Sequence, residues 1–301
     1  FNGIVLWTLD YPNWEQVTVY IKDYHAQMQR RLVAIGDTVF CTPGLTAPIT
    51  ALDAATGKPL REFKGTEGTQ EFVFHEGRIY AVIGDRMSFY SYRGAGDGDK
   101  RKKQNKKKQQ ATGKGDTGLA FNGNGFRLSL YNPRTRNAAK PVCEIVALDA
   151  GTGQEIWRSE KIADYVGCTM ALKGNKLVYQ SAHGVFCVNA QTGTEHWSVK
   201  KAIPYGLGNR PNSLVLSDEA VYSEEGPKLF AYALADGKDY WGKSIPARKG
   251  YQASTDLLIA ADALWMCGNC NNAKGVVIKQ PTSYDLKTGN EIRTIPQILS
   301  K

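Results

Sequence analysis

The most informative stretch for the fold is Ala147-Leu148-Asp149-Ala150-Gly151-Thr152-Gly153-Gln154-Glu155-Ile156-Trp157. An apolar strand ends at Asp149, whose side chain can hydrogen-bond to the backbone of a turn. Gly153 supplies the positive φ that such a turn needs. The next strand carries Trp157, a side chain large enough to cover a neighbouring sheet. The stretch therefore predicts a β-hairpin whose second strand presents an aromatic side chain to another part of the fold.

The same pattern recurs along the chain as an internal repeat. Four further copies follow or precede it, and a sixth, in residues 2–7, keeps only the turn and the following strand. In two copies Arg61 and Arg293 replace the tryptophan, and an arginine stem can also lie over an apolar surface. The residues that carry the pattern are Trp7, Asp53, Gly57, Asp149, Gly153, Trp157, Gly193, Trp197, Gly237, Trp241, Asp285 and Gly289.

Two more strands precede each copy, for example residues 169–173 and 176–180 around the turn Gly174-Asn175. Four short strands per repeat without helical spacing are typical of a propeller blade. We therefore expect an all-β chain, a β-propeller of four-stranded antiparallel blades. The repeats account for about five blades plus one strand, which predicts an incomplete ring in this chain. Residues 1–301 would form a single domain, a fragment of a larger propeller.

One repeat is much longer than the others, because it contains an insertion at residues 94–140. Residues 93–118 hold nine Lys or Arg and three Asp, so this stretch contributes +6 of the formal net charge of +9. With almost no apolar residues, its first half is expected to be flexible. Residues 119–131 alternate partly and predict an extra hairpin. The Lys-rich run 100–108 is interpreted first as a solvated loop, and otherwise as a tether to an anionic partner.

The only CxxC sequence is formed by Cys267 and Cys270. Asn271 stands where attachment of a c-type haem needs histidine, and no second cysteine pair completes a zinc site. We expect a loop disulfide or two free thiols, and no metal site.

A binding site is expected where the first strand of each blade begins, because these residues surround one mouth of the central channel. They are polar, and a water-filled channel would by itself account for that. No nucleophile, base and orienting residue can be assembled from them, so no catalytic residue is predicted. The candidate ligand-binding residues are His25, Gln27, Gln29, Arg31, Gln70, Glu71, Arg210, Asn212, Tyr251 and Gln252.

These repeats resemble the tryptophan-docking repeats of the quinoprotein alcohol dehydrogenase-like superfamily, also called PQQ-like repeats. That group includes an outer-membrane assembly propeller lipoprotein that binds no quinone. Residues 25–34 and 42–48 are similar to planctomycete-type PQQ-binding-like propeller proteins, some of which carry a methyltransferase domain. The resemblance to the dehydrogenases implies PQQ and Ca²⁺, held with two adjacent cysteines and with Glu, Asn and Asp ligands. This sequence contains no adjacent cysteine pair.

The leading hypothesis is a non-catalytic, extracytoplasmic propeller, periplasmic for instance, that binds a partner protein or a small ligand at its channel mouth. One alternative is a PQQ-dependent dehydrogenase-like quinoprotein whose ligands lie partly outside this chain. Another is a scaffold domain of a larger enzyme such as a methyltransferase. The expected partners are a protein or the remainder of the propeller. No run of about 18 apolar residues predicts a membrane span.

Overall fold

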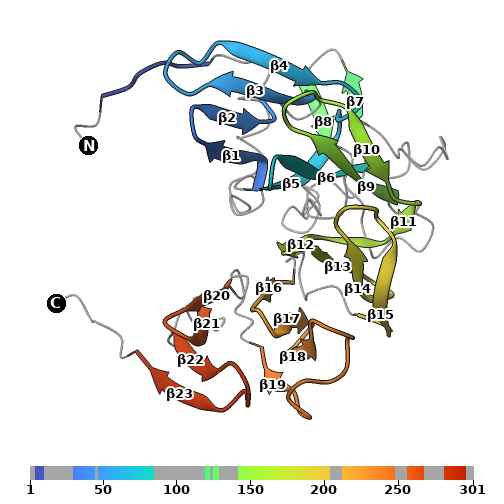
Figure 1. Cartoon of the computed structure of the whole chain (residues 1–301), viewed down its shortest axis with the longest axis vertical. Coiled ribbons are helices and arrows are strands. Elements are labelled where there is room, and N and C mark those ends of the chain that lie inside the picture. Colours follow the sequence, from blue (N-terminus) through green and yellow to red (C-terminus); the bar gives the residue numbers. More distant parts are fainter. Residues whose placement is uncertain are drawn as a thin grey trace, which may run out of the picture.

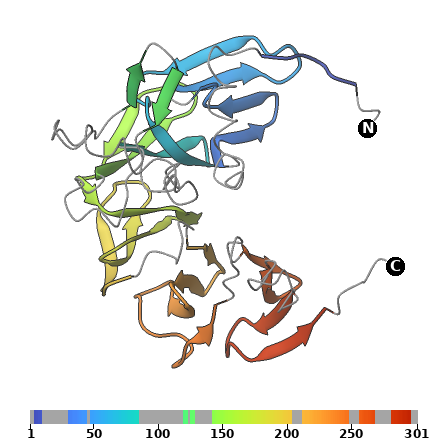
Figure 2. The same ribbon diagram turned by 180° about the vertical axis from the view of Figure 1, so that it is seen from behind.

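The fold is an open arc of five four-stranded antiparallel sheets, which we call blades 1 to 5 (Figures 1 and 2). A computed structural model of the chain describes residues 4–9, 30–44, 47–84, 119–122, 125–128, 142–203, 212–247, 256–267 and 281–295. None of these residues forms an α-helix. The predicted all-β propeller architecture is confirmed, with blade 1 and blade 5 at the two ends of the arc.

Blades 1 and 2 come first along the chain. In both blades the first strand lies nearest the centre of the arc and the fourth strand lies at its outer edge. Blade 1 consists of β1 (Leu32–Ile35), β2 (Thr38–Cys41), β3 (Ile49–Asp53) and β4 (Pro59–Phe63). Blade 2 consists of β5 (Thr69–His75), β6 (Arg78–Gly84), β9 (Val142–Asp149) and β10 (Glu155–Arg158), with the short β11 (Ile162–Ala163) also paired to β9.

Blades 3 to 5 follow without interruption by another sheet. Blade 3 consists of β12 (Tyr165–Lys173), β13 (Lys176–Ser181), β14 (Gly184–Asn189) and β15 (Glu195–Lys200). Blade 4 consists of β16 (Leu214–Leu216), β17 (Ala220–Glu225), β18 (Lys228–Ala233) and β19 (Ile245–Pro246). Blade 5 consists of β20 (Asp256–Ala260), β21 (Ala263–Cys267), β22 (Thr282–Asp285) and β23 (Glu291–Thr294).

The insertion interrupts blade 2 between its second and third strands. β6 pairs along its whole length with β9, although residues 85–141 separate them in the sequence. Within the insertion, β7 (Leu119–Asn122) and β8 (Gly125–Leu128) form a separate two-stranded sheet, so the predicted hairpin is confirmed. The Lys-rich run 100–108 lies outside the described residues.

The tryptophans of the repeat join consecutive blades. Trp157 lies in blade 2, and its indole Nε1 donates a hydrogen bond to the carbonyl oxygen of Ala190 in blade 3 at 2.9 Å. Its ring lies so close to Gly193 that a Cβ built there would be 2.7 Å from the indole. Trp197 repeats this arrangement on Gly237 of blade 4. Packing of these tryptophans between adjacent blades, expected from the sequence, is what the structure has, with both side chains buried.

Trp241 and Arg293 depart from the simplest form of that expectation, whereas Arg61 follows it. Trp241 seats on Gly289 but is only half-buried, and it lies in a bend before β19 instead of in a strand. Arg61 Nη1 donates to the carbonyl oxygens of Ala150 and Gly151 in the next blade, as expected. The Arg293 guanidinium lies 5.1 Å over the Trp265 ring of its own sheet, and the described residues contain no blade after blade 5 for it to cover.

These joints explain why Gly193 has to be glycine, and they give a first prediction. Gly193 has φ +74° and faces the Trp157 ring, whereas Gly36 has φ +56° and no atom within 4 Å of a built Cβ. Each alanine substitution should lower the free energy of unfolding by about 1–2 kcal/mol, because alanine is strained in the left-handed conformation. Only Gly193→Ala should lower it by a further amount of about 1–3 kcal/mol, because its methyl group overpacks against the Trp157 ring. We expect the urea midpoint to fall clearly further for Gly193→Ala than for Gly36→Ala. Equal midpoints would contradict the close seat of Trp157.

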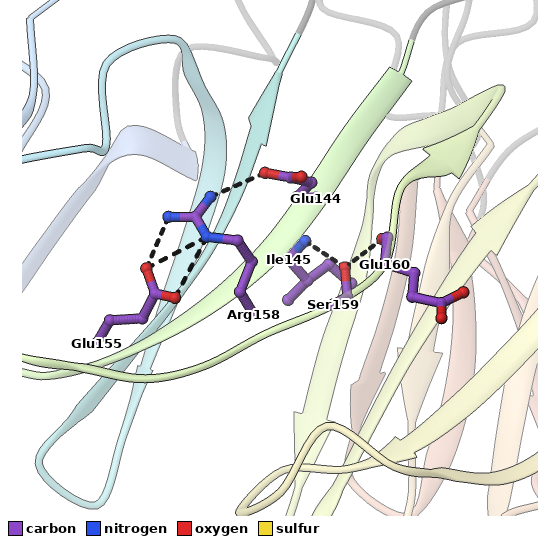
Figure 3. Close-up of polar contacts among 6 residues, drawn as sticks. All are labelled: Glu144, Ile145, Glu155, Arg158, Ser159 and Glu160. Atoms are coloured by element: carbon purple, nitrogen blue, oxygen red, sulfur yellow. Dashed lines mark hydrogen bonds and ion pairs between the residues drawn. The ribbon is translucent and has the colours of Figure 1, made fainter.

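Polar contacts also tie the outer strand of blade 2 to its neighbour (Figure 3). Arg158 pairs with Glu144 at 2.9 Å and with Glu155 at 2.7 Å, and the hydrogen bonds that it donates to Glu155 help to raise its pKa. Ser159 Oγ accepts from the amide of Ile145 at 2.9 Å, where the pairing of β10 with β9 has ended. About a third of the Arg158 side chain is exposed, so these ion pairs contribute little to stability.

Candidate binding site at the mouth end of the blades

The polar residues of the inner strands gather at one end of the arc, which we call the mouth end. It is the end where the first strand of a blade begins and the second strand finishes. In blade 3, for example, Tyr165 at the start of β12 pairs with Ser181 at the end of β13. The inner strands lie next to one another, since β12 contacts both β5 and β16, and β16 contacts β20. Side chains from several blades can therefore meet at this end.

The structure describes four of the ten candidate ligand-binding residues. Each of the four is at most 8% exposed, so they are buried between blades and do not form an open, water-filled rim. A ligand-binding role for them stays a prediction. The four are Arg31, Gln70, Glu71 and Asn212. The other six, His25, Gln27, Gln29, Arg210, Tyr251 and Gln252, lie outside the described residues.

Glu71 connects three blades through its carboxylate. Arg30, which precedes β1, places Nη1 3.0 Å from Glu71 Oε2 and 3.1 Å from the carbonyl oxygen of Met170 in blade 3. The Tyr165 hydroxyl donates to Glu71 Oε1 at 2.5 Å. Burial, followed by the charge of Glu71, raises the pKa of Tyr165 well above its usual range. Burial acts to lower the pKa of Arg30, but its attraction to Glu71 helps to give a net rise.

Sequence reasoning missed Arg30 and Tyr165. No local motif marks either residue, because their partner is distant in the chain: 41 residues separate Arg30 from Glu71, and 94 separate Tyr165 from it. The available signal was position alone, since both lie next to the start of a first strand.

Bulges shape the inner strands at the mouth end. The pairing of β5 with β6 shifts at Gln70, and the pairing of β12 with β13 shifts between Val166 and Ala171. Within the second bulge Cys168 has φ +58°, a conformation that costs about 1–3 kcal/mol for a residue other than glycine. Bulges of this kind re-aim side chains and are frequent beside functional sites. Burial and the charge of Glu71 raise the pKa of Cys168 to about 12, so its thiol stays protonated and is a poor nucleophile.

A chain of amide groups joins blade 3 to blade 4 and leaves one oxygen without a partner. Gln180 Nε2 donates to the carbonyl oxygen of Glu224 at 2.9 Å, so its Oε1 faces the other way. Asn212 Nδ2 therefore donates to that Oε1, at 3.2 Å. As a result Asn212 Oδ1 is buried with no hydrogen-bond partner among the described residues. Thr42 follows the end of β2 in blade 1. Its Oγ1 is also buried and also has no hydrogen-bond partner among the described residues.

A charged cluster beside this chain of amides is already satisfied. Glu225 accepts from Ser223 and Tyr232 through Oε1, and its Oε2 lies 2.5 Å from Lys201 Nζ. The Lys201 ammonium also lies 3.8 Å over the Phe230 ring, a favourable cation–π distance. Because every group here has a partner within the protein, the cluster holds blades 3 and 4 together.

The described residues offer no metal site and no reactive thiol pair. Across the described ranges, no three His, Cys, Asp or Glu side chains come together to hold a metal ion. Four of the cysteines are free thiols, namely Cys41, Cys143, Cys168 and Cys187. Cys270 lies outside the described residues, so the expectation that Cys267 and Cys270 form either a loop disulfide or two free thiols stays a prediction.

Comparison with known proteins gives the family. Residues 134–292, more than half of the chain, match the family described as outer membrane protein assembly factor BamB. The chain belongs to the BamB family. The matched part of this BamB-family chain runs from just before β9 into β23, so it includes Asn212 but not Arg31, Gln70 or Glu71.

Solved structures agree with the fold. BamB from Moraxella catarrhalis aligns with a TM-score of 0.51 and 12% identity over 89% of the BamB-family chain. The alignment covers 64% of that structure, so the present chain spans less than two thirds of it. Kluyveromyces lactis Hsv2, with loop 6CD replaced by a Gly-Ser linker, aligns with a TM-score of 0.50, 10% identity and coverage of 90% and 69%.

A curated enzyme is also similar to part of the chain. The 1-butanol dehydrogenase (cytochrome c) of Thauera butanivorans is 29% identical over 125 residues. The match covers 41% of the BamB-family chain and 16% of the dehydrogenase.

No described segment forms a helix with the length and apolar character needed to cross a bilayer.

Proposed function

We propose that this chain is a non-catalytic, extracytoplasmic propeller that binds a partner protein or a small ligand at the mouth end. The observation that carries the proposal is that two buried polar atoms at this end, Asn212 Oδ1 beside blade 4 and Thr42 Oγ1 beside blade 1, have no hydrogen-bond partner among the described residues. A buried polar group without a hydrogen bond costs about 1–3 kcal/mol, so a ligand that supplies the bond gains affinity. Asn212 Oδ1 can only accept, which favours a ligand with N–H or O–H donors.

The surroundings of these atoms also favour binding. Arg30 keeps 34% of its side chain exposed at the same end, next to the rigid hub of Glu71 and Tyr165. A guanidinium on a rigid scaffold is well suited to a ligand carboxylate. The family's description as an outer membrane protein assembly factor supports an extracytoplasmic location and a protein partner.

A cross-linking comparison tests where the partner binds. A photoreactive residue replaces His183, which is exposed in the turn at the mouth end of blade 3, or Gln191, which is exposed at the opposite end of the same blade. In the natural protein within its own cells, we expect His183 to give a discrete adduct and Gln191 to give none. The same adducts from both positions would contradict a mouth-end site.

Substitution of Thr42 tests the chemistry of the site. Because Thr42 Oγ1 makes no hydrogen bond in the described structure, Thr42→Val should leave the urea midpoint unchanged or slightly raised. If the hydroxyl contacts the ligand, loss of one hydrogen bond weakens binding by roughly 2- to 10-fold, read as a lower cross-linking yield from His183. An unchanged yield would remove Thr42 from the site.

The match to 1-butanol dehydrogenase (cytochrome c) favours a second candidate, a quinoprotein dehydrogenase-like function. The described residues do not provide the ligands that such a function needs. No cluster of His, Cys, Asp or Glu in the described ranges could hold Ca²⁺, and Glu71 is already bound by Arg30 and Tyr165. The sequence also has no adjacent cysteine pair. Quinone absorbance in the purified natural protein, dependent on Ca²⁺, would support this candidate against the first.

A further inference from the structure

Two polar side chains reach the mouth end of blade 3 from the blades on either side of it. Arg30, which precedes β1, places Nη1 3.1 Å from the carbonyl oxygen of Met170 in β12. Asn212, which precedes β16, places Nδ2 3.2 Å from Gln180 Oε1 in β13. The amide of Gln180 donates to Thr169 Oγ1, and Thr169 is the residue before Met170. Arg30 and Asn212 are therefore joined by a short series of contacts through β12 and β13.

At the Arg30 end, hydrogen-bond donors remain. Arg30 Nη1 is already used by Met170 and by Glu71 Oε2. Among the described residues nothing accepts from its Nε or Nη2, and 34% of the side chain is exposed. Arg31 Nε donates to the carbonyl oxygen of Gln70, so in the described part of the chain two positive charges stand beside the single negative charge of Glu71. A guanidinium with free donors and an excess of positive charge favours a carboxylate at this end.

At the Asn212 end, only an acceptor remains. Asn212 Nδ2 is used by Gln180, and Oδ1 has no hydrogen-bond partner among the described residues, although Asn212 is 1% exposed. The donors beside it are used as well, because Gln180 Nε2 donates to the carbonyl oxygen of Glu224 and the amide of Ser213 donates to Glu224 Oε2. A ligand therefore has to supply a donor at this end.

The surroundings of Asn212 favour a primary ammonium group as that donor. Asn212 Oδ1 is shielded from solvent, so a group that enters beside it has to be compact. The buried carboxylate of Glu224 is bonded to Ser213, the residue after Asn212. A nearby carboxylate stabilises the charged form of an amine.

We infer that the mouth end of blade 3 binds an amino carboxylate, a small molecule that places its carboxylate on Arg30 and its ammonium group on Asn212 Oδ1. Thr169 and Met170, which lie between the two ends, belong to the stretch of β12 where the pairing with β13 shifts. The inference rests on the proposed function and names the class of small ligand for it.

A series of amino carboxylates tests the inference without any variant. Glycine, β-alanine, γ-aminobutyrate and ε-aminocaproate carry the same two groups at increasing separation. In isothermal titration calorimetry with the purified protein, we expect one member to bind at least about 10-fold more tightly than the acid or the amine of the same chain length, because each of these lacks one charged group. Equal affinity for the acid or for the amine would overturn the inference.

Two arginine variants test whether the carboxylate binds at Arg30. Arg30→Gln should weaken binding of the best amino carboxylate by roughly 10- to 100-fold, the value of a charge-assisted hydrogen bond. Arg158 also pairs with glutamates but lies on the outer strand of blade 2, so Arg158→Gln should leave the affinity unchanged. If Arg30→Gln does not fold, Arg30→Lys keeps the charge and should weaken binding by about 10-fold, because the planar fork is lost. Equal affinities in the Arg30 and Arg158 variants would overturn the inference.

The cross-linking experiment at His183 separates this inference from the proposed function. If no amino carboxylate binds but His183 gives a discrete adduct, the inference is wrong and the proposed mouth-end site stands. If no amino carboxylate binds and His183 gives the same adducts as Gln191, both are wrong.

Discussion

Trp157→Ala is expected to lower the free energy of unfolding by about 3–5 kcal/mol, the cost of truncating a buried aromatic side chain. Trp157 is 9% exposed, packs on Gly193 of the next blade, and lies 6.2 Å from the Tyr80 ring of its own blade. The substitution removes ring packing from both blades and leaves the carbonyl oxygen of Ala190 without its donor. Urea unfolding followed by circular dichroism measures the loss. Because blades contact mainly their neighbours, exchange should first quicken in blades 2 and 3.

Two variants serve as controls for this prediction. Ile156 precedes Trp157 in the same strand but is 40% exposed, so Ile156→Ala should stay within about 0.5 kcal/mol of the parent. Trp157→Phe keeps a ring and loses the hydrogen bond to Ala190, which costs about 1 kcal/mol besides the smaller ring. If Trp157→Ala costs no more than Ile156→Ala, the tryptophan does not hold the joint.

Glu71→Ala is expected to cost about 3 kcal/mol. Removal of one partner of a buried ion pair typically costs about 3–5 kcal/mol, since the other charge stays buried and unpaired. The lower end applies here, because a third of the Arg30 side chain reaches water. The buried Tyr165 hydroxyl also loses its acceptor. The same urea experiment measures the effect, which should loosen blades 1, 2 and 3 together.

Glu144→Ala is the matched control for Glu71→Ala. Glu144 also pairs with an arginine, Arg158, at 2.9 Å, but both side chains are about a third exposed. Its removal should cost at most about 1 kcal/mol. Tyr165→Phe should cost about 1 kcal/mol, because Glu71 keeps its pairing with Arg30. Equal losses for Glu71→Ala and Glu144→Ala would show that burial adds nothing to the Glu71 pairing.

The sequence by itself determined the blades, because the hairpin that marks each blade depends on a few consecutive residues. Asp149 Oδ1 accepts from the amide of Thr152 at 2.6 Å and from its hydroxyl at 2.8 Å, and these bonds lower the pKa of Asp149. Asp53 and Asp285 repeat the arrangement with the threonines three residues later. Propensity, turn chemistry and the alternation of apolar residues all act over such short spans, so they can be recognised without the fold.

The burial and the partners of the mouth-end residues could be learned only from the tertiary structure. From the sequence, Glu71 is a polar residue near the start of a strand, equally suited to a water-filled channel and to a binding rim. The fold brings Arg30, Met170 and Tyr165 to it from two other blades and removes it from water. In the same way, Leu32 and Phe72 each lie three residues before the end of a first strand, but Leu32 is 60% exposed and Phe72 is 1% exposed, because blade 1 packs against Phe72. Burial and pairing depend on which distant segments meet, and a local pattern carries no information about that.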